Sequence, residues 1–167
     1  MTSCSKITLL ALTVCIALVA QSDGAEPPKL SGSYMLQNKA TGLMLRPEGA
    51  YSSDGTTMVL FEKKDWACLT YNFTANEFGG YTLKNHYTHK TFQPTKNGAS
   101  QIAIGDVKVP YWLIEPVGDN GYYIKDPATG RVLSAPSAEA KQNAAVVLEK
   151  AAEKATQIWQ LVRSNRK

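Results

Sequence analysis

Side chains with catalytic chemistry are few in this chain of 167 residues, which has three cysteines and two histidines. A thiol nucleophile needs a basic partner, and His86 and His89 occur in one turn-like stretch with no evident link to Cys68. Within the run Trp66-Ala67-Cys68-Leu69, burial is the expected state of that thiol. The sequence has no His-Glu-x-x-His, phosphate-loop or Gly-x-Ser-x-Gly motif and no set of zinc ligands. We therefore predict a non-enzymatic protein with no metal site and no cofactor.

Binding chemistry is better represented, in the stretch from Phe61 to Trp66, where aromatic rings flank Lys63, Lys64 and Asp65. A ring can stack on the apolar face of a sugar while charged groups bond its hydroxyls, and a sugar needs both because water competes for every hydroxyl. The positive charges favour an acidic or sulfated glycan. The alternative is that Phe61 completes a core and the charges form a solvated turn.

Composition argues against a dedicated nucleic-acid-binding protein and against a disordered chain. The 18 Lys and Arg residues nearly balance 14 Asp and Glu residues, so the net charge of +4 lacks the density of a dedicated nucleic-acid surface. A hydrophobic content of 44% is enough for a real core. The length fits one soluble domain.

The N-terminal segment has the layout of a secretory signal peptide. Lys6 precedes an apolar run from Ile7 to Ala20, and small residues follow. A run of 14 residues is too short for a good membrane anchor, which needs about 20, although an uncleaved anchor is the alternative. We predict a signal peptide over residues 1–22, cleavage between 22 and 26, an extracellular protein and no membrane insertion. Cleavage would leave Cys68 as the lone cysteine, without an intramolecular disulfide.

Three stretches align without a gap, beginning at Gly32, Gly79 and Asn120. These stretches span residues 32–45, 79–92 and 120–133. Each copy then continues into a short apolar run and an aromatic residue that is followed two positions later by an apolar one. The distance from opening tyrosine to closing aromatic is 37 residues in the first and third copies and 31 in the second. The matched positions are Tyr34/Tyr81/Tyr122, Leu36/Leu83/Ile124, Asn38/Asn85/Asp126, Thr41/Thr88/Thr129, Leu45/Phe92/Leu133 and Tyr71/Trp112/Trp159.

Each copy predicts four strands. Tyr34 and Leu36 share one strand face, and the Asn-x-x-Thr-Gly stretch from Asn38 to Gly42 favours a tight turn. His89 replaces that glycine in the middle copy. One such unit cannot cover its own apolar face, whereas three around a pseudo-threefold axis can. We predict an all-β fold, a β-trefoil over residues 31–167, with repeats at about 31–78, 79–119 and 120–167.

The segment 137–156 conflicts with this register, because its Ala, Glu and Lys content favours a helix. The β-branched run Val146-Val147-Leu148 occupies the position of Val59-Leu60 in the first copy. We follow the register and expect strand there, with room for a helical turn in the flanking loops.

The motif Gln157-Ile158-Trp159, together with the threefold repeat, resembles the ricin B-type β-trefoil lectin family. The resemblance implies that the motif tryptophan is a core residue. We expect the structural core to include Tyr34, Tyr71, Tyr81, Trp112, Tyr122, Gln157 and Trp159.

In that family a carboxylate just after the second strand and an aromatic residue about 15 positions on hold the sugar. The first position is occupied here by Arg46, Gln93 and Ser134, none of them acidic. The second is occupied by Phe61 in the first copy and Glu149 in the third. The best candidate site is therefore in the first repeat, with Arg46, Phe61, Lys64, Asp65 and Trp66 as its ligand-binding residues.

Asn72-Phe73-Thr74 is an N-glycosylation sequon, and alternation with Tyr71 and Phe73 would point Asn72 outward.

Three functions stay open. The first is a secreted carbohydrate-binding protein with a glycan partner. The second is a protease inhibitor of the mycocypin or Kunitz-like kind, offering the loop 135–143 to an extracellular protease, since a rigid loop binds at small entropic cost. The third is a secreted effector that binds another extracellular protein.

Overall fold

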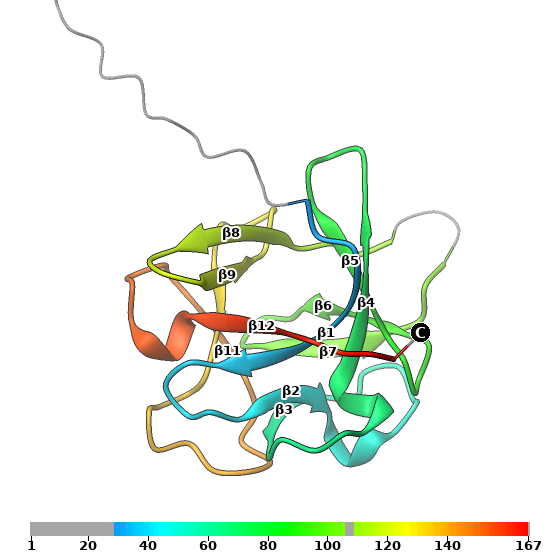
Figure 1. Cartoon of the computed structure of the whole chain (residues 1–167), viewed down its shortest axis with the longest axis horizontal. Helices are drawn as coiled ribbons and strands as arrows, with labels where there is room; N and C mark the ends of the chain where they lie inside the picture. Colours follow the sequence, from blue (N-terminus) through cyan, green and yellow to red (C-terminus); the bar gives the residue numbers. More distant parts are fainter. Residues whose placement is uncertain (1–28, 106–108, 167) are drawn as a thin grey trace, which may run out of the picture.

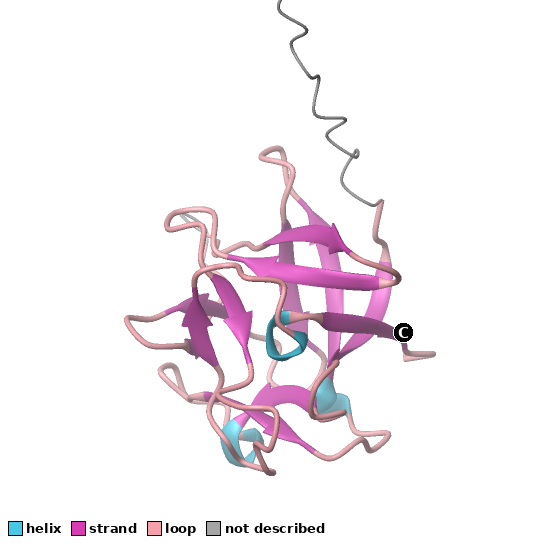
Figure 2. Ribbon diagram, turned by 90° about the vertical axis from the view of Figure 1, so that its left-hand side faces the viewer, coloured by secondary structure: helices cyan, strands magenta, loops and turns pink. Residues whose placement is uncertain are grey.

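The computed structural model describes residues 29–105 and 109–166. The predicted signal peptide and its cleavage region lie outside them. Twelve strands occur in the described residues, together with three short 3-10 helices (Figures 1 and 2). None of the helices in these ranges is long and apolar enough to cross a membrane. The strands are β1 (Gly32–Asn38), β2 (Met44–Pro47), β3 (Met58–Phe61), β4 (Thr70–Ala75), β5 (Tyr81–Asn85), β6 (Thr91–Pro94), β7 (Ala99–Ile102), β8 (Leu113–Val117), β9 (Gly121–Lys125), β10 (Val132–Ser134), β11 (Val147–Glu149) and β12 (Trp159–Arg163).

Six strands form a closed ring. β1 pairs with β4, β4 with β5, β8 with β9, β9 with β12, and β12 with β1, all antiparallel. The remaining junction, between β5 and β8, is closed by reciprocal hydrogen bonds of 2.9 Å between the main chains of Tyr81 and Trp112. Figure 1 shows β12 lying beside β1 across the middle of the molecule, so the last strand seals the barrel against the first.

The other six strands form three hairpins, β2–β3, β6–β7 and β10–β11. Single bridges join each hairpin segment to the other two: Thr57 with Ser100, Val59 with Ala145, and Gly98 with Val147. The hairpins thus meet in a triangle, one from each repeat. Closure of the ring and of this triangle leaves few free strand edges, as the triplicated sequence predicts.

The turn after the first strand is the same in all three repeats. In the first, Asn38 Oδ1 accepts the backbone N–H groups of Ala40 and Thr41 at 3.2 and 3.3 Å, and in the second Asn85 Oδ1 accepts those of Tyr87 and Thr88 at 3.0 and 3.1 Å. The third uses Asp126, whose Oδ1 accepts the Ala128 N–H at 3.1 Å.

The residue that ends this turn adopts a left-handed backbone conformation in all three repeats, although its type differs in the second repeat. Gly42 and Gly130 have φ values of 70° and 69°, and His89 adopts a φ of 58° at the same place. His89 donates its backbone N–H to the Asn85 carbonyl at 3.0 Å, as Gly42 does to that of Asn38 at 2.9 Å. The turn bonds of Asn85 therefore hold a non-glycine residue in this region.

The three closing rings lie in the interior. Trp112 and Trp159 have no exposed surface and Tyr71 has 1%. Trp112 Nε1 donates to the Phe92 carbonyl at 3.0 Å, Trp159 Nε1 donates to that of Leu133 at 2.8 Å, and the Tyr71 hydroxyl donates to that of Leu45 at 3.4 Å. The acceptors are equivalent positions in the three repeats.

The opening tyrosines differ from one another. Tyr34 and Tyr81 are buried, and the described N-terminal segment covers them: the Tyr34 hydroxyl donates to Ser31 O, and Leu30 N–H donates to the Tyr81 hydroxyl, both at 3.1 Å. Tyr122, expected in the core, packs against it but is only partly buried. Its hydroxyl has no such bond among the residues that the structure describes.

The segment 137–156 follows the repeat register. β11 pairs with β10, and helix is confined to one 3-10 turn, Ala155–Gln157. The Gln157 amide donates to the Lys150 carbonyl at 2.9 Å and accepts the Ala152 N–H at 2.8 Å. Tertiary pairing and this glutamine override the local helix preference.

Replacement of Gly98 by alanine should lower the free energy of unfolding by about 1–3 kcal/mol, because the new Cβ would clash with the Val146 carbonyl oxygen where two hairpins meet. Urea denaturation measures it. Gly105→Ala is the matched control: Gly105 is exposed and a Cβ there meets nothing within 4 Å. Equal stability of the two variants would contradict this prediction, because it would show that the segments at Gly98 and Val146 can move apart without loss of stability.

Candidate functional site

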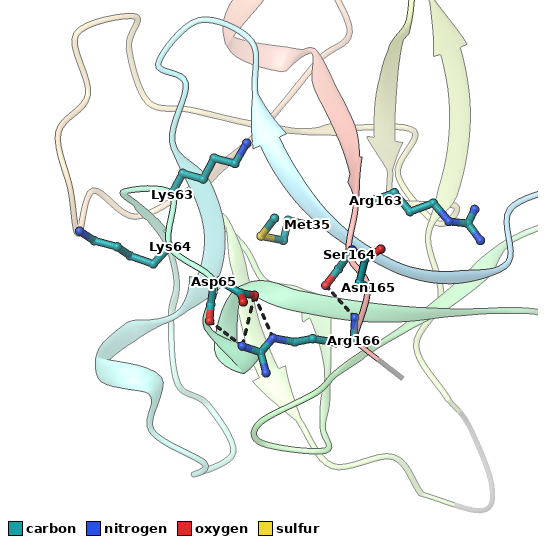
Figure 3. Close-up of a pocket in the computed structure, with 8 residues that line it drawn as sticks. All are labelled: Met35, Lys63, Lys64, Asp65, Arg163, Ser164, Asn165 and Arg166. Carbon is teal, nitrogen blue, oxygen red and sulfur yellow. Dashed lines mark hydrogen bonds and ion pairs between the residues drawn. The ribbon is translucent and has the colours of Figure 1, made fainter.

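The candidate stretch forms the loop that leaves β3 and enters the short helix η2 (Ala67–Leu69). Lys63, Lys64, Asp65 and Trp66 are all exposed. Across from this loop lies the end of β12 with the residues that follow it, as Figure 3 shows. Barrel closure therefore brings the first repeat against the C-terminal segment of the third.

Phe61 differs from the expectation of an open stacking ring. Only 7% of it is exposed, in an apolar cluster with Met35, Met44, Cys68 and Leu69. The Arg46 guanidinium carbon lies 3.4 Å from the centre of its ring. Phe61 therefore completes a core, which was the alternative interpretation.

Arg46 is itself 8% exposed and lines neither of the two surface hollows of this region. Its cation–π contact with Phe61 contributes on the order of 0.5–2 kcal/mol. This side chain serves packing in the structure, contrary to its expected place at the ligand.

Trp66 supplies the open ring instead. It is 46% exposed, and its ring centre is 5.6 Å from that of Phe61. A hollow of about 330 Å³ lies against Trp66. Its walls are formed by Ala50, Asp65, Trp66, Ala67, Cys68, Tyr87 and Arg166. We call this the aromatic hollow.

Tyr87 was not anticipated from the sequence. It is 59% exposed and comes from the turn after β5, in the second repeat. Its backbone N–H is held by Asn85 Oδ1 at 3.0 Å. The repeat pattern assigned this stretch to a turn, and only the pairing of β4 with β5 shows that the turn reaches the loop of Trp66.

A second hollow, of about 660 Å³, adjoins the first. We call it the basic hollow because four of its wall residues are cationic. It is lined by Met35, Lys63, Lys64, Asp65, Arg163, Ser164, Asn165 and Arg166 (Figure 3). Arg163 ends β12 and Arg166 follows it, and the antiparallel pairing of β12 with β1 places both at this hollow.

Asp65 and Arg166 belong to both hollows and form an ion pair between them. The Asp65 Oδ1 atom lies 3.2 Å from Arg166 Nη2 and accepts a hydrogen bond from Arg166 Nε at 3.2 Å. The aspartate side chain is 88% exposed and that of the arginine 36%. Exposed ion pairs of this kind contribute about 0–1 kcal/mol to stability.

The pKa of His86 responds to the positive charges near Arg166. Partial burial lowers the pKa of His86, and the charges of Arg166, His89 and Lys84 lower it further. Its Nε2 lies 2.9 Å from Ser33 Oγ. The imidazole is therefore held in its neutral form near neutral pH, within reach of the Arg166 charge.

Cys68, the cysteine within the described residues, is a buried free thiol. Cys68 is 6% exposed, within an apolar cluster. In the ranges that the structure describes, no group of three or more His, Cys, Asp or Glu side chains could hold a metal ion.

The sequon residue Asn72 is half-buried on β4, between Tyr71 and Phe73, which face the core. Its Nδ2 donates to Thr74 Oγ1 at 3.5 Å. Glycosylation at Asn72 stays a prediction.

Neither a protein-family model nor a curated protein sequence matches the chain. Solved structures do. The designed threefold-symmetric protein ThreeFoil aligns with a TM-score of 0.73 and 22% identity, over 80% of this chain and 99% of its own. The chain is a β-trefoil.

Two natural proteins share this β-trefoil fold. The ricin B-like lectin of Macrolepiota procera, solved with lactose, aligns at a TM-score of 0.69 with 16% identity, over 82% of this chain and 99% of the lectin. A proteinase inhibitor from Coprinopsis cinerea aligns at 0.66 with 16% identity, over 82% and 100%. Both of these folds are like that of this β-trefoil, in accord with the resemblance seen in the sequence.

Replacing Arg166 by glutamine should raise the pKa of His86 toward its usual 6.5, because one nearby positive charge is lost while the effect of burial remains. Proton NMR titration of the imidazole measures it, with Arg131→Gln as the control. Since folding depresses this pKa, the contribution of His86 to stability is present above pH 6.5 and is lost as the pH falls through the folded pKa. An unchanged His86 pKa in Arg166→Gln would show that the Arg166 charge does not act on His86.

Proposed function

We propose that this β-trefoil is a secreted, non-enzymatic carbohydrate-binding protein that takes a sugar ring in the aromatic hollow. The observation that carries the proposal is the joint exposure of Trp66 and Tyr87 on one hollow that also contains Asp65 and Arg166. The rings offer stacking surfaces to the apolar face of a sugar, and the carboxylate and guanidinium offer an acceptor and donors to its hydroxyls. The lectin with the same fold supports this assignment.

Secretion is part of the proposal and rests on the N-terminal segment of residues 1–22. An extracellular glycan is the expected partner. The absence of a catalytic motif in the sequence supports a role in binding without turnover.

Trp66→Ala should weaken binding of a glycan by about tenfold, which corresponds to about 1.4 kcal/mol of lost stacking. A glycan array on the purified protein identifies the ligand, and isothermal titration calorimetry gives the affinities. Phe78→Ala is the matched control, because Phe78 is a ring that is 66% exposed and lines neither hollow. Silence across neutral and acidic glycans, or equal affinity in both variants, would contradict the proposal.

Protease inhibition is the second candidate, favoured by a specific loop. Residues 136–139 are exposed, while the ends of the loop are held by Ala135 N–H to Thr156 O at 2.8 Å and by Asn143 N–H to Leu60 O at 2.7 Å. An anchored loop of this kind is preorganised for an enzyme cleft. Assays with papain-like and trypsin-like proteases test it, and no inhibition at micromolar concentration would remove this candidate.

A further inference from the structure

We propose that the basic hollow binds the anionic substituent, a sulfate or carboxylate, of a glycan whose sugar ring occupies the aromatic hollow. This rests on the proposed function and names the class of glycan. The two hollows adjoin through the Asp65–Arg166 pair, so one ligand can enter both.

The cations of the basic hollow are not equivalent. Lys64 Nζ lies 3.4 Å from Glu62 Oε1, and Arg166 is paired with Asp65. Lys63 and Arg163 form no ion pair with a carboxylate among the described residues. Arg163 Nη1 does donate a hydrogen bond to the Tyr34 hydroxyl at 3.1 Å. Figure 3 shows the Lys63 side chain extending on the same side of the loop as Met35, above it in the view, while that of Lys64 extends to the opposite side. Lys63 is thus the cation best placed to meet an anion here.

Neutral groups complete the environment that an oxyanion requires. Ser164 and Asn165 line the hollow with polar side chains, and Met35 forms part of its apolar wall. An oxyanion accepts hydrogen bonds from such donors as well as from the ammonium and guanidinium groups. Arg166 donates both to the Asp65 carboxylate and, at 2.5 Å, to the Asp65 main-chain oxygen. The carboxylate pair is exposed and weak, so this part of the contact can be exchanged for an incoming anion at small cost.

The limited extent of the positive charge favours a glycan over a nucleic acid. A polynucleotide is bound along a track of cations that matches its phosphate spacing. Here the four cations surround a single hollow, and the whole chain carries a net charge of only +4. The aromatic rings beside it suit a sugar carrying one or a few anionic groups.

The test compares matched glycans on the full protein: neutral oligosaccharides, including lactose, and their sulfated and sialylated forms. We expect the acidic member of a matched pair to bind at least about tenfold more tightly than the neutral one. Lys63→Gln should reduce this advantage to about threefold or less without changing the affinity for the neutral member. Lys64→Gln is the control in the adjacent position, and it should keep most of the advantage. Thermal melting of each variant confirms that it folds.

The outcomes distinguish failure of the anionic subsite from failure of the proposed carbohydrate-binding function. Equal binding of neutral and acidic members would overturn the anionic subsite and leave the proposed function standing. An acidic preference that Lys63→Gln does not reduce would overturn the placement of the subsite. No binding of either member would overturn both. A single-stranded DNA oligonucleotide that binds as tightly as the sulfated glycans, with no loss in Trp66→Ala, would show a general polyanion surface and overturn the inference.

Discussion

The structure depends on the hydrogen bonds that the three closing rings make in the shared interior. A buried N–H or O–H donor without an acceptor would destabilise the fold by about 1–3 kcal/mol. Each ring instead donates to a main-chain carbonyl within the second strand of its own repeat. The last strand of the unit is thereby tied to its hairpin. Because the last strands belong to the barrel and the hairpins to the triangle, these bonds join the two parts of the fold three times.

The side chains that directly follow these three acceptors are buried or partly buried. Arg46 lies over Phe61, and Ser134 is fully buried with its hydroxyl donating to the Ala135 carbonyl at 2.8 Å. The equivalent Gln93 is partly buried on β6. The positions at which the resembled lectins hold a carboxylate are thus part of the packing in this chain. Trp66, Tyr87 and the charged residues Lys63, Lys64 and Asp65 lie on connecting loops, outside the repeated strands.

The repeat was sufficient to predict the fold because it records where side chains must face a common interior. Its limit is seen at Phe61, since the repeat locates a strand end but does not say whether the ring there is covered. Tyr87, Arg163 and Arg166 could not be assigned to the site from spacing, because they come from the second and third repeats. They approach the Trp66 loop only after β5 pairs with β4 and β12 with β1. Closure of the barrel, a long-range event, creates the candidate site.

The same closure of the barrel places the two hollows side by side, with Asp65 and Arg166 in the walls of both. Arg166 follows the strand that seals the barrel, and its bond to Asp65 separates the aromatic hollow from the basic one. Under the proposed function, a neutral sugar would bind beside this pair and leave it intact, whereas an anionic group would compete with Asp65 for the guanidinium. Exposed pairs are weak, while a bidentate bond from arginine to an oxyanion is among the stronger polar contacts. Selection between neutral and acidic ligands at this corner therefore depends on the difference between these two bonds, with Lys63 adding its charge to the anionic side.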